Sequence, residues 1–130
     1  MTSVAIIFEG KNNTILLQLR DEKAPTYPGM WGLFGGAIEA GEKAIQAAVR
    51  EVREELGINL REGDLVLLLE INSGNDNFHV FKSKFPWNLK DIKLDEGQDM
   101  KFFSREEISQ LNNLVPLLKQ FGDAYWKTLT

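Results

Sequence analysis

Residues Gly36–Ile58 contain the side chains whose types and spacing are best suited to metal binding or catalysis. They read GAIEAGEKAIQAAVREVREELGI. The segment combines a glycine turn, an arginine and several acids in the pattern G-x5-E-x7-R-E-V-R-E-E-L-G-I. Acids at close range raise one another's proton affinity unless a cation lies among them. Hard divalent cations such as Mg2+ prefer oxygen ligands and are often shared between carboxylates and substrate phosphates. The segment therefore predicts an acid cluster that can hold a divalent cation.

A helix over Lys43–Leu56 is predicted to position these acids, because the segment lacks Pro and Gly and is rich in strong helix formers. Gly57 follows it, where a left-handed C-cap is favoured. At about 100° per residue, Glu51, Glu54 and Glu55 fall within an arc of roughly 100°. An apolar stripe lies on the neighbouring arc and is expected to face the core. The acids should therefore form a compact patch beside a buried surface.

These acids also have a plainer interpretation. Three acids on one side of an amphipathic helix are usually a solvated face, and Arg50 with Glu54 at i+4 would be an ordinary surface pair. The whole constellation favours a site instead, because a Gly-Gly loop precedes the helix and Glu42 stands at a fixed distance from the other acids. In that interpretation, Arg50 holds a neighbouring acid in orientation.

The segment resembles the Nudix box of the Nudix hydrolases and matches it at every fixed position. Upstream, residues 31–36 read WGLFGG and are similar to the family's W-x-x-P-G-G, with Phe34 in place of the usual Pro. The resemblance implies a hydrolase in which water attacks a phosphorus of a nucleoside diphosphate linked to another group. It also implies bound Mg2+, with Mn2+ as a substitute.

The resemblance assigns roles to residues of the box. The metal ligands that it implies are the Gly35 carbonyl and the carboxylates of Glu51, Glu54 and Glu55. Glu51, Glu54 and Arg50 would be catalytic, with Arg50 orienting the acids, and Glu42 would brace the loop against the helix. Physical reasoning agrees, since phosphoryl transfer needs charge neutralisation and an aligned nucleophile, and a metal ion lowers the pKa of water. A carboxylate can accept the proton of that water.

A further acid is expected in the segment Asp95-Glu96-Gly97-Gln98, just before a predicted strand. Many Nudix enzymes carry an acid here that binds metal or acts as a base. Glu96 is the candidate for both roles, catalytic residue and metal ligand. Asp95 and Asp99 are its rivals, and a plain charged loop is the alternative.

Four side chains are candidates for substrate binding: Trp31, Arg20, Phe34 and Phe78. The three rings could stack on a nucleobase, as could Tyr27, although packing in the core or at its rim is the more common role of such rings. Arg20 opens the loop that borders the expected site and could reach a phosphate.

Composition narrows the class of protein. The chain has 130 residues, of which 43% are hydrophobic and 26% charged, enough for one domain with a core. It has no cysteine, which excludes disulfides, a thiol nucleophile and a cysteine zinc site. The net charge of -4 argues against long RNA or DNA as a partner. The amino terminus lacks a signal-peptide pattern and the apolar runs are too short to span a membrane, so we expect a cytoplasmic protein.

The pattern of elements predicts the α/β class. Strands are predicted at Val4–Phe8, Thr14–Leu19, within Trp31–Ile38, and at Asp64–Asn72, Phe78–Phe85 and Met100–Phe103. The first two are predicted to form a hairpin. A capping box at Ser104–Glu107 opens a short helix to about Leu111, and a last helix is predicted over Leu114–Trp126 with Pro116 in its first turn. The resemblance adds the Nudix fold, an α/β/α sandwich with a mixed β-sheet, as a single domain over residues 1–130.

The resemblance leaves three functions to distinguish. A nucleotide pyrophosphohydrolase would convert a nucleoside triphosphate, including oxidised ones such as 8-oxo-dGTP, into a monophosphate and pyrophosphate. This function is favoured because Ser73–Asn75 lacks the Pro of many ADP-ribose enzymes and the Tyr of many dinucleoside polyphosphate enzymes. The alternatives are a hydrolase of nucleotide sugars or other nucleoside diphosphate derivatives, and a non-catalytic nucleotide sensor. The partner is a small-molecule nucleotide in each case, and homodimers are frequent in the family.

Overall fold

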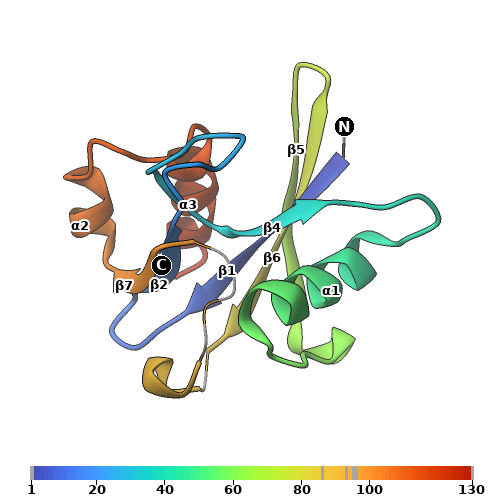
Figure 1. Ribbon diagram of the computed structural model, residues 1–130, viewed down its shortest axis with the longest axis horizontal. Helices are drawn as coiled ribbons and strands as arrows, with labels where there is room; N and C mark the ends of the chain where they lie inside the picture. The colour runs from blue at the N-terminus through green and yellow to red at the C-terminus, as the bar shows by residue number, and fades with distance from the viewer. Residues whose placement is uncertain (1, 86, 93, 95–96, 130) are drawn as a thin grey trace.

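A mixed β-sheet forms the centre of the fold, with α1 on one side and α2 and α3 on the other (Figure 1). The computed structural model describes residues 2–85, 87–92, 94 and 97–129. The strands are β1 (Thr2–Glu9), β2 (Ile15–Leu19), β3 (Trp31–Gly32), β4 (Phe34–Ala37), β5 (Val66–Ser73), β6 (Asp76–Lys84) and β7 (Asp99–Phe103). The helices are α1 (Ala44–Leu56), α2 (Arg105–Ser109) and α3 (Leu118–Lys127), with short 3-10 turns η1 (Glu62–Asp64) and η2 (Leu89–Asp91).

Strand β1 organises the sheet because three strands pair with it. β6 runs parallel to β1 along its whole length, from Thr2↔Asn77 to Glu9↔Lys84. β4 pairs antiparallel with its first half, and β2 joins it only at Glu9↔Ile15 before continuing to β3 and β7. The predicted hairpin therefore closes only at its turn, since β2 leaves β1 to pair with other strands.

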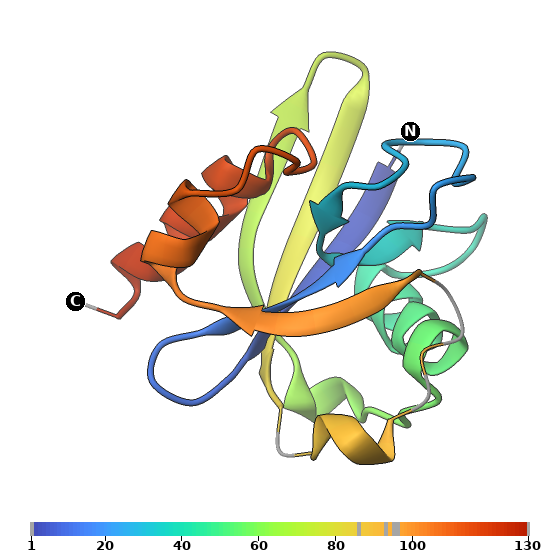
Figure 2. The ribbon, with the colours of Figure 1, turned by 60° about the vertical axis from the view of Figure 1, so that its left-hand side comes forward.

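Alternation along β1 divides the core into two halves. Val4, Ile6 and Phe8 pack with α1, whereas Ala5 and Ile7 pack with α3. Successive side chains of a strand point to opposite faces of a sheet, and both faces of β1 are covered by helices (Figure 2). This confirms the predicted layers and explains why β1 reads as an unbroken apolar run.

The start of the last helix was predicted four residues too early. Leu114 forms a parallel bridge with Trp31, and the Val115 N–H donates to the Trp31 carbonyl at 2.9 Å. Leu117 then has a left-handed backbone with φ 75°, so α3 begins only at Leu118, and Pro116 lies before the helix. By contrast, the predicted capping box of α2 is present. Within the described ranges, every helix is too short or too polar to cross a membrane.

Candidate active site

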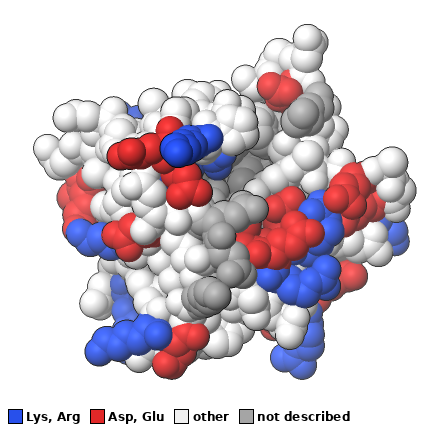
Figure 3. Space-filling model, viewed as in Figure 1, with Lys and Arg blue, Asp and Glu red and all other residues white. Residues whose placement is uncertain are grey.

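Helix α1 and the loop that leads into it from β4 present the acids of the candidate site. α1 begins at Ala44, one residue later than predicted, and ends at Leu56, followed by the predicted left-handed C-cap Gly57 with φ 69°. Its buried side, which includes Ala48 and Val52, packs on β1 and β4. Acidic side chains gather on the surface above this helix (Figure 3). The helix is thus anchored by its apolar face, which fixes the position of its acidic edge.

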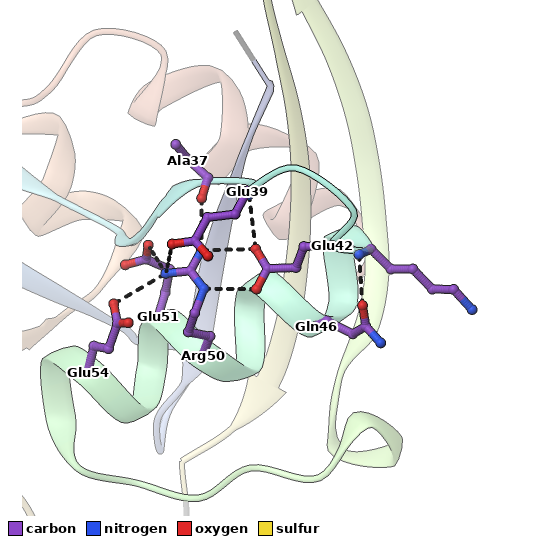
Figure 4. A network of polar contacts seen from close by, with 8 residues as sticks. Ala37, Glu39, Glu42, Gln46, Arg50, Glu51 and Glu54 are labelled. Atoms are coloured by element: carbon purple, nitrogen blue, oxygen red, sulfur yellow. Dashed lines mark hydrogen bonds and ion pairs between the residues drawn. The ribbon is translucent and has the colours of Figure 1, made fainter.

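Arg50 lies at the centre of these acids (Figure 4). Its Nε and Nη2 donate to the two carboxylate oxygens of Glu42 at 2.8 and 3.0 Å, which is the bidentate geometry that a guanidinium favours. Its Nη1 donates to Glu51 at 2.9 Å and to Glu54 at 3.2 Å. Nη2 also donates to the Ala37 carbonyl at 2.9 Å. One side chain therefore links the end of β4, the loop and two turns of α1.

The contacts between Arg50 and Glu42 change the pKa of both side chains. The hydrogen bond from Arg50, and then that from the Glu39 backbone N–H, lower the pKa of Glu42 from its ordinary value of 4.5 to about 2. The same contact with Glu42 raises the pKa of Arg50 above its ordinary value. Glu42 is therefore ionised at any ordinary pH; its contact with Arg50 ties the loop to α1, and its contact with the Glu39 N–H lies within the loop.

The two glycines of β4 are required for different reasons. The Glu51 carboxylate lies directly against Gly36, and a Cβ there would overlap it. Gly35 has φ 150°, and a Cβ there would overlap the Val4 carbonyl of the neighbouring strand. Gly36 therefore leaves room for an acid, whereas Gly35 lets β4 pair with β1.

Glu55 has a different environment from the other acids of the box. It is only 3% exposed, whereas the side chain of Glu54 is 52% exposed. The Gly35 N–H donates to its Oε2 at 3.2 Å, and the Gln18 Nε2 donates to its Oε1 at 3.4 Å. Sequence reasoning missed Gln18, although a polar residue inside the apolar run ILLQL was a usable signal.

The acids point to different partners in this structure. Among the described residues, no group of three or more His, Asp or Glu side chains is arranged to hold a metal ion. Arg50 lies between Glu42, Glu51 and Glu54, while Glu55 faces Gly35 and Gln18. The donor set is nevertheless entirely of oxygen, which is the chemistry that Mg2+ prefers.

A cavity of about 800 Å³, within the size range of small-molecule sites, has Gln18 in its wall. Its walls include Gln18, Arg20 and Gln98. The Arg20 guanidinium is held there by the backbone oxygen and hydroxyl of Thr26, at 2.9 and 3.1 Å. Because Gln18 also contacts Glu55, the cavity and the buried acid share one side chain. Arg20 therefore lies in the wall of this cavity, and its role in substrate binding stays a prediction.

The three predicted rings of the substrate site are packed in the protein. Phe34 has no exposed surface and contacts the edge of Phe8 at 6.1 Å between centroids, so it has no free face for a base, and we withdraw it as a substrate-binding residue. Trp31 packs on Phe103 at 4.8 Å and Phe78 lies near Phe121 at 5.5 Å, in the α3 half of the core. The structure therefore does not bring Trp31 and Phe78 to the acids.

The predicted acid outside the box is only partly covered by the structure. Glu96 and its rival Asp95 lie outside the described residues. Asp99 is exposed and its carboxylate accepts the Met100 N–H at 2.8 Å, which is a local contact at the start of β7. The assignment to Glu96 therefore stays a prediction.

Comparison with known proteins defines the class. The NUDIX domain family matches residues 1–125. A nucleoside triphosphatase NudI of Escherichia coli is 37% identical over 135 aligned positions, covering 96% of this chain and 79% of NudI. The E. coli ORF135 protein is 29% identical with a TM-score of 0.71, over 99% and 90% of the two chains. A MutT protein of Methanosarcina mazei, at 24% identity, shares the fold over 100% and 95% with a TM-score of 0.77.

The chain therefore belongs to the Nudix family. It is a Nudix hydrolase, an enzyme of the class that cleaves phosphoric anhydride bonds in nucleoside diphosphate-linked compounds. Such hydrolases generally use divalent metal ions.

Proposed function

We propose that the protein is an Mg2+-dependent pyrophosphohydrolase that converts a nucleoside triphosphate, including an oxidised one, into a monophosphate and pyrophosphate. The observation that carries this proposal is the acid group of α1, organised by Arg50 and laid against the glycines of β4. The name of the E. coli relative, a nucleoside triphosphatase, supports a triphosphate as substrate. We also propose that residues 1–130 form one Nudix domain.

The donor chemistry of the residues, which is entirely of oxygen, fits a hard divalent cation. Those that would hold it are the Gly35 carbonyl and the carboxylates of Glu51, Glu54 and Glu55. Bound Mg2+ supplies charge neutralisation for phosphate oxygens and lowers the pKa of water. Arg50 holds Glu51 and Glu54 on the same nitrogen, so their carboxylates stay close together on α1. Glu96 is proposed as the base or as a further ligand.

The cavity lined by Gln18, whose amide contacts Glu55, suits a nucleotide. At about 800 Å³ it can take a base and sugar, and Arg20 supplies a cation in its wall. The contact of the Arg20 guanidinium with Thr26 fixes that charge at low cost in side-chain entropy on binding. We therefore propose that Arg20 contacts the phosphate chain of the substrate.

The test is to measure pyrophosphate and phosphate release separately, with Mg2+, from triphosphates, 8-oxo-dGTP, ADP-ribose, nucleotide sugars and dinucleoside polyphosphates. We expect pyrophosphate from triphosphates, lost with EDTA and reduced at least about 100-fold in kcat by Glu54→Gln. The matched control is Glu106→Gln, an exposed acid on α2, which should retain full activity. Turnover of nucleotide sugars alone would support the alternative hydrolase. Tight nucleotide binding without any turnover would identify a sensor.

A further inference from the structure

Gln18 is a buried amide in an otherwise apolar strand. It is 3% exposed, and the three residues before it on β2 have no exposed surface. Burial of an amide costs free energy unless its polar atoms find partners. The Gln18 Nε2 donates to the Leu33 carbonyl and to Glu55 Oε1, each at 3.4 Å. The amide is thus shared between a backbone oxygen and a carboxylate of the Nudix box.

The orientation of this amide is fixed by the groups around it. Its two acceptors are oxygens, so the NH2 end must face them, because the amide oxygen would repel both. The amide oxygen faces Gly97, where a Cβ would lie 3.1 Å from Gln18 Oε1 and 2.9 Å from the Leu19 carbonyl. Gly97 has φ 90°, and its N–H donates to Asp21 at 3.2 Å. Gly97 therefore lies over the far side of Gln18.

Gln18 and the backbone hold Glu55 from two sides. The Gly35 N–H contacts one carboxylate oxygen and the Gln18 amide contacts the other. Glu55 is 3% exposed, so bulk water contributes little to its orientation. Gln18 also lines the cavity described above. One amide thus connects the cavity with the buried acid.

We propose that Gln18 is a positioning residue, which fixes the place of the Glu55 carboxylate beside Gly35 and so supports its role as a ligand of the divalent cation. The proposal rests on the proposed function, in which Glu55 is a metal ligand. Outer-shell partners of metal ligands typically contribute 10- to 100-fold in metal affinity or activity. We expect Gln18→Met to weaken Mn2+ binding by about 10-fold and to lower kcat by a similar factor. KM for the triphosphate should change by less than about 3-fold, since the amide acts through Glu55.

The experiment titrates the full chain with Mn2+ in the absence of substrate and follows free Mn2+ by electron paramagnetic resonance. The matched control is Gln98→Met, because the Gln98 amide lines the same cavity but donates to the Arg20 carbonyl at 2.8 Å. It should keep the Mn2+ affinity within about 2-fold. Gln18→Asn withdraws the amide by about 1.5 Å while keeping a polar group, and it should weaken binding even if Gln18→Met does not fold.

The double variant Gln18→Met/Glu55→Gln decides whether Gln18 acts through Glu55. We expect Gln18→Met to have no further effect on Mn2+ affinity once Glu55 is Gln, since coupled residues are not additive. Full additivity, or single Gln18 variants that match Gln98→Met, would overturn the inference while leaving Glu55 as a ligand. Unchanged Mn2+ binding in Glu55→Gln alone would instead overturn the metal assignment of the proposed function, and this inference with it.

Discussion

Replacement of Arg50 by Met should convert the acid group of α1 from a stabilising network into a set of repelling charges. The guanidinium is 15% exposed and donates to Glu42, Glu51, Glu54 and the Ala37 carbonyl. Removal of one member of a buried charge network costs about 3–5 kcal/mol. We take only the lower figure, about 3 kcal/mol, because this network is half-buried rather than buried and water screens Glu54. For a chain of this size, that is a fall of about 10 °C in Tm.

The loss of stability caused by Arg50→Met should depend on pH, and the contacts of Glu42 determine the direction of that dependence. The pKa of Glu42 is lowered to about 2 from an ordinary 4.5, so its ionised form stabilises the fold. That contribution is complete above pH 4.5 and disappears as pH falls from 4.5 towards 2. Arg50→Met loses the part of this contribution that the Arg50 contact supplies and keeps the part that the Glu39 N–H supplies. The difference in the free energy of unfolding between wild type and variant should therefore be largest above pH 5 and shrink by pH 3.

The assay is urea unfolding of both proteins between pH 3 and pH 7 in EDTA, followed by circular dichroism. Arg53→Met is the matched control, because Arg53 is exposed on the same helix one turn away. It should lose no more than about 0.5 kcal/mol. The reasoning is refuted if the two variants lose equal stability at pH 7, or if the Arg50 loss stays constant down to pH 3.

Other substitutions should separate packing from chemistry. Gly36→Ala should displace the Glu51 carboxylate and lower kcat by at least about 10-fold, with a small change in Tm. Gly35→Ala should instead break the pairing of β4 with β1 and lower Tm by about 10 °C. Activity assays and thermal melts of both variants test these expectations. Trp31→Ala should cost about 2 kcal/mol of stability and change KM by less than about 3-fold, because the indole packs in the α3 half of the core. A large rise in KM at unchanged Tm would instead show that Trp31 contacts the substrate.

Sequence reasoning succeeded where structure is decided locally. Helix α1, its left-handed C-cap at Gly57 and the capping box of α2 follow from neighbouring residues, and all were predicted. The pairing of Arg50 with Glu54 also follows from helical spacing. The reach of Arg50 to Glu42 does not follow from that spacing, because it depends on how the loop folds back on the helix.

Features that depend on distant segments were missed. The last helix starts late because residues 113–115 pair with Trp31, more than eighty residues earlier in the chain. Phe34 replaces a Pro in the family pattern and was predicted to bind substrate, but its place on β4 directs the ring into the α1 half of the core. Gln18 acquires its partners only when β2, β4 and α1 meet. One sequence alone does not show which distant segments pair, so it does not show which of these contacts form.

The acids of the box have different environments, so substitutions of the same kind should have different consequences. Glu54 is half exposed and accepts a hydrogen bond from Arg50, so Glu54→Gln should remove a ligand at a cost of no more than about 0.5 kcal/mol of stability.

Glu55 faces a donor on each oxygen, the Gly35 N–H and the Gln18 amide. A Gln at position 55 has only one oxygen, and its NH2 group would have to face one of those donors. Glu55→Gln should therefore lose about 1–3 kcal/mol of stability as well as activity, because a buried donor is left without an acceptor. Urea unfolding of the two variants in EDTA measures the difference, and equal stability would show that the buried carboxylate is not held as these contacts indicate.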